Sequence, residues 1–143
     1  MKTVYTAQAP EAIGPYSQAI ISGNLVFTSG QIAINPQTGK VEKTDIEGQT
    51  VQVLENLTAV LEAAGCSLEQ VVKTTCFLAD MKDFARFNEI YGGSFTGKPA
   101  RSCVAAKELP KGVLVEVEAI GEVEFFPYIP IFPKTRPVFR KNT

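Results

Sequence analysis

Apolar and acidic residues alternate from Val115 to Ala119 within segment 115–120, which has the sequence Val-Glu-Val-Glu-Ala-Ile. A period of two is typical of a β-strand with one buried face and is incompatible with an amphipathic helix. A second apolar segment, 101–106, opens with Arg101, and only the short connection 107–112 separates it from the first. The spacing therefore predicts a β-hairpin.

The hairpin register that this connection favours brings four reactive side chains to one face of the sheet. Cys103 then faces Glu116, and Arg101 faces Glu118. A guanidinium fork suits a planar carboxylate ligand, and a nearby carboxylate can position a water or accept a proton. The pattern alone equally describes an ordinary cross-strand ion pair on a solvated face, which contributes less than about 1 kcal/mol. On spacing alone we favour that second interpretation.

The remaining periodicities predict an α+β two-layer sandwich with a mostly antiparallel sheet and two helices on one face. The expected elements are strands 17–22 and 25–34 around a Gly23-Asn24 turn, a helix from a Thr44/Asp45 cap to Gly65, a strand 71–78, a helix 81–91 ended by Gly92-Gly93, and strands 101–106 and 113–124. The second sheet face is not polar throughout, so we expect oligomerisation to cover it.

The chain divides into one domain, 1–124, and a C-terminal extension, 125–143, rich in proline and aromatic residues. The extension carries four basic residues and no acid, so residues 1–124 sum to −5 within a net charge of −1. Proline spacing favours extended polyproline II in the extension. It either packs on the body or a neighbouring subunit, which we favour, or serves as a docking peptide for a partner.

Composition excludes several kinds of chemistry. The chain of 143 residues has no histidine, which removes Ser-His-Asp triads, Cys-His nucleophiles and most zinc sites. Three cysteines without CxxC spacing, and no leader after Met1, predict a reducing, cytoplasmic location. No apolar run reaches membrane-spanning length, and an acidic body argues against nucleic-acid binding.

Two motifs that suggest ligands are rejected. Segment 92–98 begins like a phosphate-binding loop, but Pro99 follows it, and the flanking elements are in the wrong order. Asp80 and Asp83 lack a correctly spaced third ligand, so we expect no metal site.

Several segments together resemble the YjgF/RidA family of enamine/imine deaminases over residues 2–124. They are 12–19 (AIGPYSQA), 28–32 (TSGQI), 63–65 (AAG), 72–75 (VKTT) with Phe77, Phe84 to Asn88, 99–104 (PARSCV), and Leu109-Pro110 with 115–120 (VEVEAI). With this resemblance we favour a catalytic site over the simple ion pair.

The resemblance implies a chorismate-mutase-like fold, a homotrimer with clefts between subunits, and no cofactor. It implies hydrolysis of 2-aminoacrylate and 2-iminobutanoate to 2-keto acids and ammonia. Arg101 would bind the substrate carboxylate, Glu116 would position the water, and the backbone of Cys103 would help to hold either one. The cleft would be lined by Tyr16, Ser29, Gly30 and Asn88, with Tyr16 contributed across the interface.

Two other functions stay open for relatives of this kind. One is an RNA-acting translation inhibitor or endoribonuclease, and the other is a chaperone-like trimer that binds keto acids without turnover. The segment 92–98 is shorter than usual in the family, and the extension 125–143 lies outside the family pattern. The first departure bears on the size of substrate that the cleft accepts, and the second on what lies at the cleft entrance.

Overall fold

A computed structural model describes residues 1–123 of the chain, so the expectations for extension 125–143 lie outside the described residues. The strands are β1 (Lys2–Val4), β2 (Ala19–Ser22), β3 (Leu25–Thr28), β4 (Ile34–Asn35), β5 (Lys40–Val41), β6 (Val71–Leu78), β7 (Ala100–Ala105) and β8 (Val115–Glu122), and the helices are α1 (Ile46–Ala63) and α2 (Phe84–Ser94). Of the helices in this part of the chain, none combines the length and the apolarity needed to cross a membrane.

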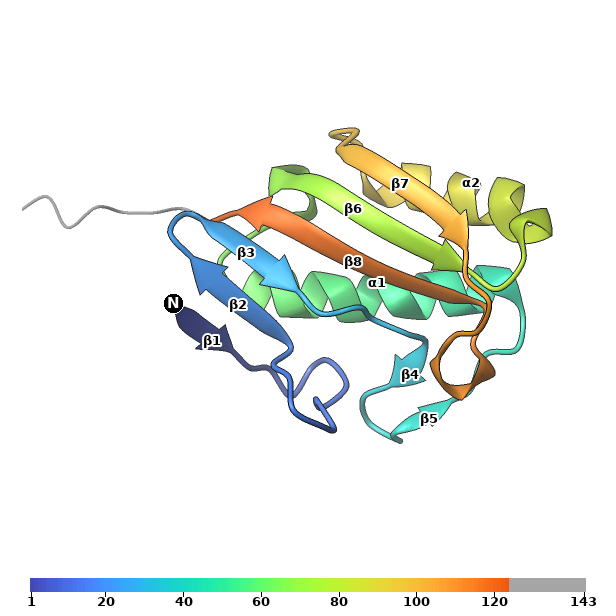
Figure 1. Cartoon of the computed structure of the whole chain (residues 1–143), viewed down its shortest axis with the longest axis horizontal. Helices are drawn as coiled ribbons and strands as arrows, with labels where there is room; N and C mark the ends of the chain where they lie inside the picture. Colours follow the sequence, from blue (N-terminus) through green and yellow to red (C-terminus); the bar gives the residue numbers. More distant parts are fainter. Residues whose placement is uncertain (124–143) are drawn as a thin grey trace, which may run out of the picture.

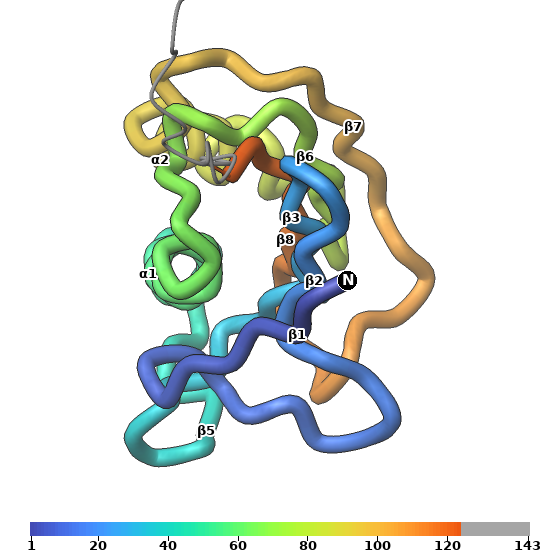
Figure 2. Tube along the Cα trace, turned by 90° about the vertical axis from the view of Figure 1, so that its left-hand side faces the viewer, coloured from blue at the N-terminus to red at the C-terminus, as the bar shows by residue number. Residues whose placement is uncertain are grey.

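The predicted α+β two-layer sandwich is confirmed. Six strands form one sheet in the order β1-β2-β3-β8-β6-β7, and only the β6–β7 pair is parallel. Figure 1 shows α1 and α2 running side by side behind this sheet, and Figure 2 shows both helices on the same side of it. The short strands β4 and β5 form a separate hairpin.

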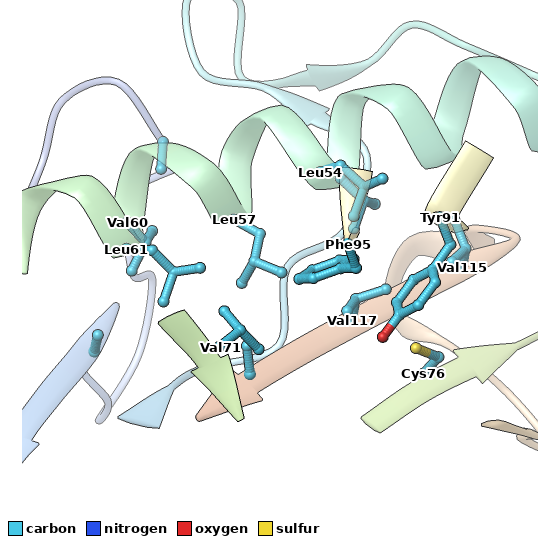
Figure 3. Close-up of a cluster of buried hydrophobic side chains, with 14 of the residues drawn as sticks. Leu54, Leu57, Val60, Leu61, Val71, Cys76, Tyr91, Phe95, Val115 and Val117 are labelled. Atoms are coloured by element: carbon cyan, nitrogen blue, oxygen red, sulfur yellow. The ribbon is translucent and has the colours of Figure 1, made fainter. Parts of the chain in front are cut away.

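The core lies between α1 and the sheet. The buried face of α1 presents apolar residues at helical spacing, among them Val53, Leu57, Val60 and Leu61, each fully shielded from solvent. They meet the inward-facing residues of β6 and β8, as Figure 3 shows. Burying aliphatic side chains of this size typically contributes about 1.5–3 kcal/mol each, so this interface fixes α1 on the sheet.

The boundaries of α1 follow from local chemistry. The Asp45 side chain caps the helix by accepting a hydrogen bond from Gly48 N at 3.0 Å, so of the two predicted cap residues, Thr44 and Asp45, the structure uses Asp45. At the other end Gly65, with φ +80°, allows its own N–H and that of Cys66 to bond back to Glu62 O and Leu61 O. This Schellman arrangement confirms the predicted helix end.

The predicted end of the second helix is wrong. Helix α2 continues through Gly92 and Gly93 to Ser94, and Phe95 is its C-cap residue. Glycine lowers helix propensity without breaking hydrogen bonds, and burial of Tyr91 and Phe95 holds this last turn against the sheet.

The predicted hairpin between 101–106 and 113–124 is also wrong. Strand β6 lies between β7 and β8, pairing parallel with β7 and antiparallel with β8. The connection from β7 to β8 therefore passes a whole strand instead of forming a tight turn. It includes the 3₁₀ turn Pro110–Gly112, with Lys111 at φ +57°.

This strand order places the charged residues on opposite faces. Arg101 of β7 pairs with Thr74 of β6, and Thr74 pairs in turn with Ala119 of β8. These paired residues point to the same side of the sheet, and Thr74 and Ala119 face the helices. Glu116 shares its row with Phe77 on the outer face. The face predicted to hold a guanidinium, a thiol and two carboxylates is therefore not formed within one chain.

Candidate functional site

The Arg101 side chain extends from the edge strand β7 toward α2, where it contacts Phe84, Asn88 and Tyr91. Its Nη1 donates a 2.6 Å hydrogen bond to Asn88 Oδ1. Among residues 1–123 no carboxylate lies within ion-pair distance of this guanidinium. A half-buried, unpaired guanidinium is an anion-binding group, because its fork of N–H donors suits a carboxylate.

Aromatic rings hold the guanidinium in place. Arg101 Cζ lies 4.7 Å from the centre of the Tyr91 ring and 5.6 Å from that of Phe84. The Tyr91 hydroxyl shares a 2.6 Å hydrogen bond with Thr74 Oγ1 in the core, and its ring stacks on Phe95 at 4.5 Å. Cation–π contact and a fixed ring restrict where the guanidinium can point. We call Arg101, Asn88 and Tyr91 the arginine site.

A hollow of about 410 Å³ adjoins the arginine site. It is lined by Asn88, Tyr91, Gly92, Phe95, Thr96, Lys98, Pro99 and Arg101. Lys98, with φ +52°, adds a second cation at the rim, and no acid lines the hollow. The charge of its lining therefore favours an anion.

A second group of predicted residues gathers around Glu116 on β8. The backbones of Gln31 and Val117 exchange hydrogen bonds of 2.9 and 3.1 Å, which brings Gly30 against the Glu116 side chain. A Cβ atom on Gly30 would lie only 2.8 Å from Glu116 Cδ. Glycine is therefore the only residue at position 30 that leaves room for the Glu116 carboxylate in its observed position.

Tyr16 joins this group through a loop that Gln18 anchors. Gln18 Nε2 donates to Thr6 O at 3.0 Å and to Pro10 O at 2.9 Å, while Thr6 N donates to Gln18 Oε1 at 2.7 Å. The anchored loop closes one side of a hollow of about 320 Å³. The hollow is lined by Pro10, Glu11, Ile13, Tyr16, Gln18, Gly30, Gln31, Ile32, Ile34, Pro110, Lys111 and Glu116. We call Glu116, Gly30 and Tyr16 the glutamate site.

The environment of Glu116 makes its carboxylate more basic than usual. Burial raises the pKa of Glu116, and the negative charge of Glu118, two residues along the same outer face, raises that pKa further. A carboxylate with a raised pKa accepts a proton more readily, which suits it to general-base chemistry.

Cys103 and Ser29 belong to neither hollow. Cys103 lies beside Cys76 on the helix-facing side of the sheet, and burial raises the pKa of its thiol while Arg101 lowers it. In the predicted hairpin Cys103 faces Glu116, whose negative charge would raise the pKa of the thiol. That cause is wrong, because Cys103 lies in register with Cys76 and Val117 and with no carboxylate. Ser29 Oγ donates to Ser17 O at 2.6 Å and so fixes the loop that carries Tyr16.

The seven predicted site residues thus fall into two groups on opposite faces of one sheet. Asn88 and Arg101 lie together, with Cys103 on the same strand as Arg101. Tyr16, Gly30 and Glu116 lie together elsewhere, with Ser29 next to Gly30 in the chain and bonded to the loop that carries Tyr16. Sequence reasoning missed the contributions of Tyr91, Lys98 and Lys111. Tyr91 was assigned to the core by its helical spacing, and no pattern marked either lysine.

Within residues 1–123, no three His, Cys, Asp or Glu side chains gather closely enough to hold a metal ion. The arrangement instead offers a guanidinium, whose donors suit a carboxylate, and a carboxylate with a raised pKa, which suits a proton acceptor.

The fold is a two-layer α+β domain with one candidate hollow on each face of its sheet. Comparison with known families agrees: the model described as Endoribonuclease L-PSP matches residues 6–123. The chain belongs to this family, the YjgF/RidA family that its sequence motifs resemble.

Similar proteins cover the same domain. A RutC family protein of Pyrococcus horikoshii is 54% identical over 124 residues, covering 86% of this chain and 98% of the relative. The 2-iminobutanoate/2-iminopropanoate deaminase of Escherichia coli K12 is 49% identical over 124 residues, covering 84% and 96%. The crystal structure of E. coli TdcF with bound serine is 44% identical, with a TM-score of 0.82, and covers 85% and 98%.

Proposed function

We propose that this protein hydrolyses 2-imino acids, such as 2-iminobutanoate and the imine form of 2-aminoacrylate, to 2-keto acids and ammonia. The arginine site of one copy and the glutamate site of a neighbouring copy would form each active site, in a homotrimer with three clefts. The similarity to an E. coli deaminase of this class at 49% identity supports the choice of substrate.

The unpaired guanidinium of Arg101 is the observation that carries the proposal. It is half-buried, aligned by Asn88 and Tyr91, and has no carboxylate partner among the described residues. Leaving such a group unpaired is costly unless a ligand completes it. A 2-imino acid supplies the planar carboxylate, and TdcF, at 44% identity, holds serine, whose carboxylate has the same chemistry.

The reaction needs little beyond positioning and proton transfer, because an imine carbon is already electrophilic. Arg101 holds the carboxylate, and Glu116 takes a proton from water as the water oxygen bonds to the imine carbon. The imine nitrogen takes a proton from a solvent water, giving a carbinolamine. Glu116 then returns its proton to the amine nitrogen and the C–N bond breaks. The carbinolamine hydroxyl gives its proton back to solvent as the keto group forms, and ammonia leaves. Holding water and imine in line can lower the barrier by on the order of 7–11 kcal/mol in ideal cases.

The other residues have supporting roles in this scheme. Asn88 orients Arg101, the backbone of Cys103 contacts substrate or water, and Tyr16 and Gly30 shape the cleft beside Glu116. Ser29 holds the Tyr16 loop and offers its hydroxyl oxygen to the cleft. The raised pKa of the Cys103 thiol argues against a nucleophilic role.

Assembly is proposed because neither hollow holds both reactive groups. The outer face of the sheet also exposes Phe27 (41%), Val72 (41%) and Val104 (48%), which a neighbouring copy would cover. The three cysteines are free thiols, which fits the cytoplasmic location that we propose.

A competition assay tests the proposal. Threonine dehydratase acting on threonine generates 2-iminobutanoate, semicarbazide traps it, and the protein competes with the trap. We expect wild type to divert imine to keto acid and Arg101→Ala to lose nearly all of this activity. The matched control, Arg86→Ala, removes an exposed arginine paired with Glu47 and should retain activity. If wild type leaves the trapping rate unchanged, the proposed reaction is wrong.

A further inference from the structure

A groove runs between the two helices on the side away from the sheet. Its floor is apolar, formed by Val51, Leu54 and Ala59 of α1 and Ile90 of α2, and its volume is about 330 Å³. Glu55 and Glu62 stand along its α1 side. Thr58 of α1 and Ser94 of α2 complete the lining. We call these eight residues the helix groove. It lies apart from both hollows of the candidate site.

An ion pair joins the two helices near their N-terminal ends. Arg86 of α2 contacts Glu47 of α1 at 2.6 Å, and it also contacts Glu89 of its own helix at 3.3 Å. Among residues 1–123 no ion pair joins the helices at the other end, beside Glu62. We call the side of the groove at the C-terminal ends of both helices its open end.

The open end attracts positive charge. No basic residue lines the helix groove, and neither α1 nor α2 has a basic residue in its last turn. The C-terminal end of a helix carries a partial negative charge, which adds to the charges of Glu55 and Glu62. An occupant with apolar side chains and several cations would match both the floor and the rim.

Segment 124–143 of this chain has that composition. It contains five aromatic residues, four prolines and the cations Lys134, Arg136, Arg140 and Lys141, and Pro137 and Phe139 lie among these cations. Its attachment point is also near the open end: Gly121 of β8 lies directly against Cys66 Sγ, just after α1, and Val123 N donates to Asn24 O at 2.9 Å.

The length of the segment is sufficient. Twenty residues in a polyproline II conformation extend about 60 Å, at roughly 3.1 Å per residue. The 18 residues of α1 extend about 27 Å. The segment can therefore turn around the end of α1 and still follow the whole groove.

We propose that segment 124–143 docks in the helix groove of its own copy. Its aromatic and proline residues cover the apolar floor, and its cations lie beside Glu55 and Glu62. The proposal is independent of the catalytic function, because the helix groove shares no residue with the arginine or glutamate site.

Zero-length cross-linking of the full chain tests this docking. A water-soluble carbodiimide joins a carboxylate to a lysine amine only where the two are in contact. We expect peptide mass spectrometry to find Lys134 or Lys141 bonded to Glu55 or Glu62, in protein that migrates as a single chain on a denaturing gel. Hydrogen exchange should also be slowed in segment 125–133 of wild type.

Matched variants separate docking from random contact. Glu55→Gln/Glu62→Gln should reduce total cross-linking of the two tail lysines at least fivefold, whereas Glu108→Gln, an exposed acid on the β7–β8 connection, should leave it unchanged. Cross-links found only in a two-chain band would place the segment on a neighbouring copy and overturn the proposal. Cross-links spread equally over Glu108 and other remote acids, or full-speed exchange of 125–133 in wild type, would also overturn it.

Discussion

Gly30 leaves the space in which the Glu116 carboxylate lies, so Gly30→Ala should damage catalysis more than folding. A new Cβ would lie 2.8 Å from Glu116 Cδ, and the flexible carboxylate end would move away. A displacement of about 1 Å can cost a factor of about 100, so we expect kcat/KM in the imine assay to fall by about 100-fold. The free energy of unfolding should change by less than about 1 kcal/mol.

Gly93→Ala is the matched control for that substitution. It adds the same methyl group where no atom lies within 4 Å of the new Cβ, and Gly93 lines neither hollow. It should retain full activity. Equal losses of activity in the two variants would contradict the role assigned to Gly30.

Glu118 should set part of the pH dependence through its charge. Because Glu116 must be deprotonated to act as a base, activity rises with pH through the pKa of Glu116. Burial and the Glu118 charge both raise that pKa, so Glu118→Gln lowers it and shifts the acid limb of the kcat/KM profile to lower pH. Burial still acts, so the pKa of Glu116 stays above its ordinary value.

Glu122→Gln is the control for this pH experiment. It removes one negative charge from the same strand, and Glu122 is not among the groups that raise the pKa of Glu116. Its profile, corrected for uncatalysed imine hydrolysis at each pH, should match that of wild type. An unshifted acid limb in Glu118→Gln would show that Glu116 is not the base.

Alternation and family motifs single out Arg101 and Glu116 in the sequence, and these are the two residues on which the proposed site depends. Sequence reasoning could not assign Tyr91, because an aromatic residue at helical spacing has the same pattern whether it only fills the core or also supports a guanidinium. That second role depends on β7 lying at the sheet edge, under α2. The cause given for the Cys103 pKa was wrong because it depended on the incorrect hairpin register.

At the level of elements, the last turn of α2 offers a test of how glycine affects a helix. Gly93 has a helical backbone conformation, and glycine in a helix costs roughly 0.5–1 kcal/mol relative to alanine. Gly93→Ala should raise the free energy of unfolding by about that amount in chemical denaturation. Gly23→Ala, at φ +61° in the β2–β3 turn and equally unobstructed, should lower it instead. If both substitutions changed the free energy of unfolding in the same direction, this explanation of the two glycines would be wrong.

The predicted strands and turns are correct where the residues of the segment itself determine its conformation. Strand 71–78 matches β6 at both ends, and Gly23-Asn24 forms the expected two-residue turn, with Ser22 opposite Leu25. The β7–β8 hairpin failed because a short connection indicates adjacent strands only when no other strand can insert between them. Here β6, eight residues long like β8, takes that place. The spacing of residues along the chain does not show which distant strands pair, such as β6 with β8.

The molecule as a whole separates its two reactive groups on opposite faces of one sheet. A single copy therefore cannot bring Arg101 and Glu116 into one cleft without rearranging β7, β6 and β8, which form the most extensively paired part of the sheet. Symmetric assembly of identical copies joins the two faces without any such change. The expectation of an oligomer, first made from the uncovered sheet face, thus also follows from the positions of the site residues.

Mixing two inactive variants tests this central claim most directly. Arg101→Ala and Glu116→Gln should each be inactive alone. When both are co-expressed with distinct mass tags, about a quarter of the clefts in a randomly mixed trimer contain both intact groups. The imine assay should then recover about that fraction of wild-type activity. Mixed assemblies that form, as seen by native mass spectrometry, but remain inactive would contradict a site shared between copies.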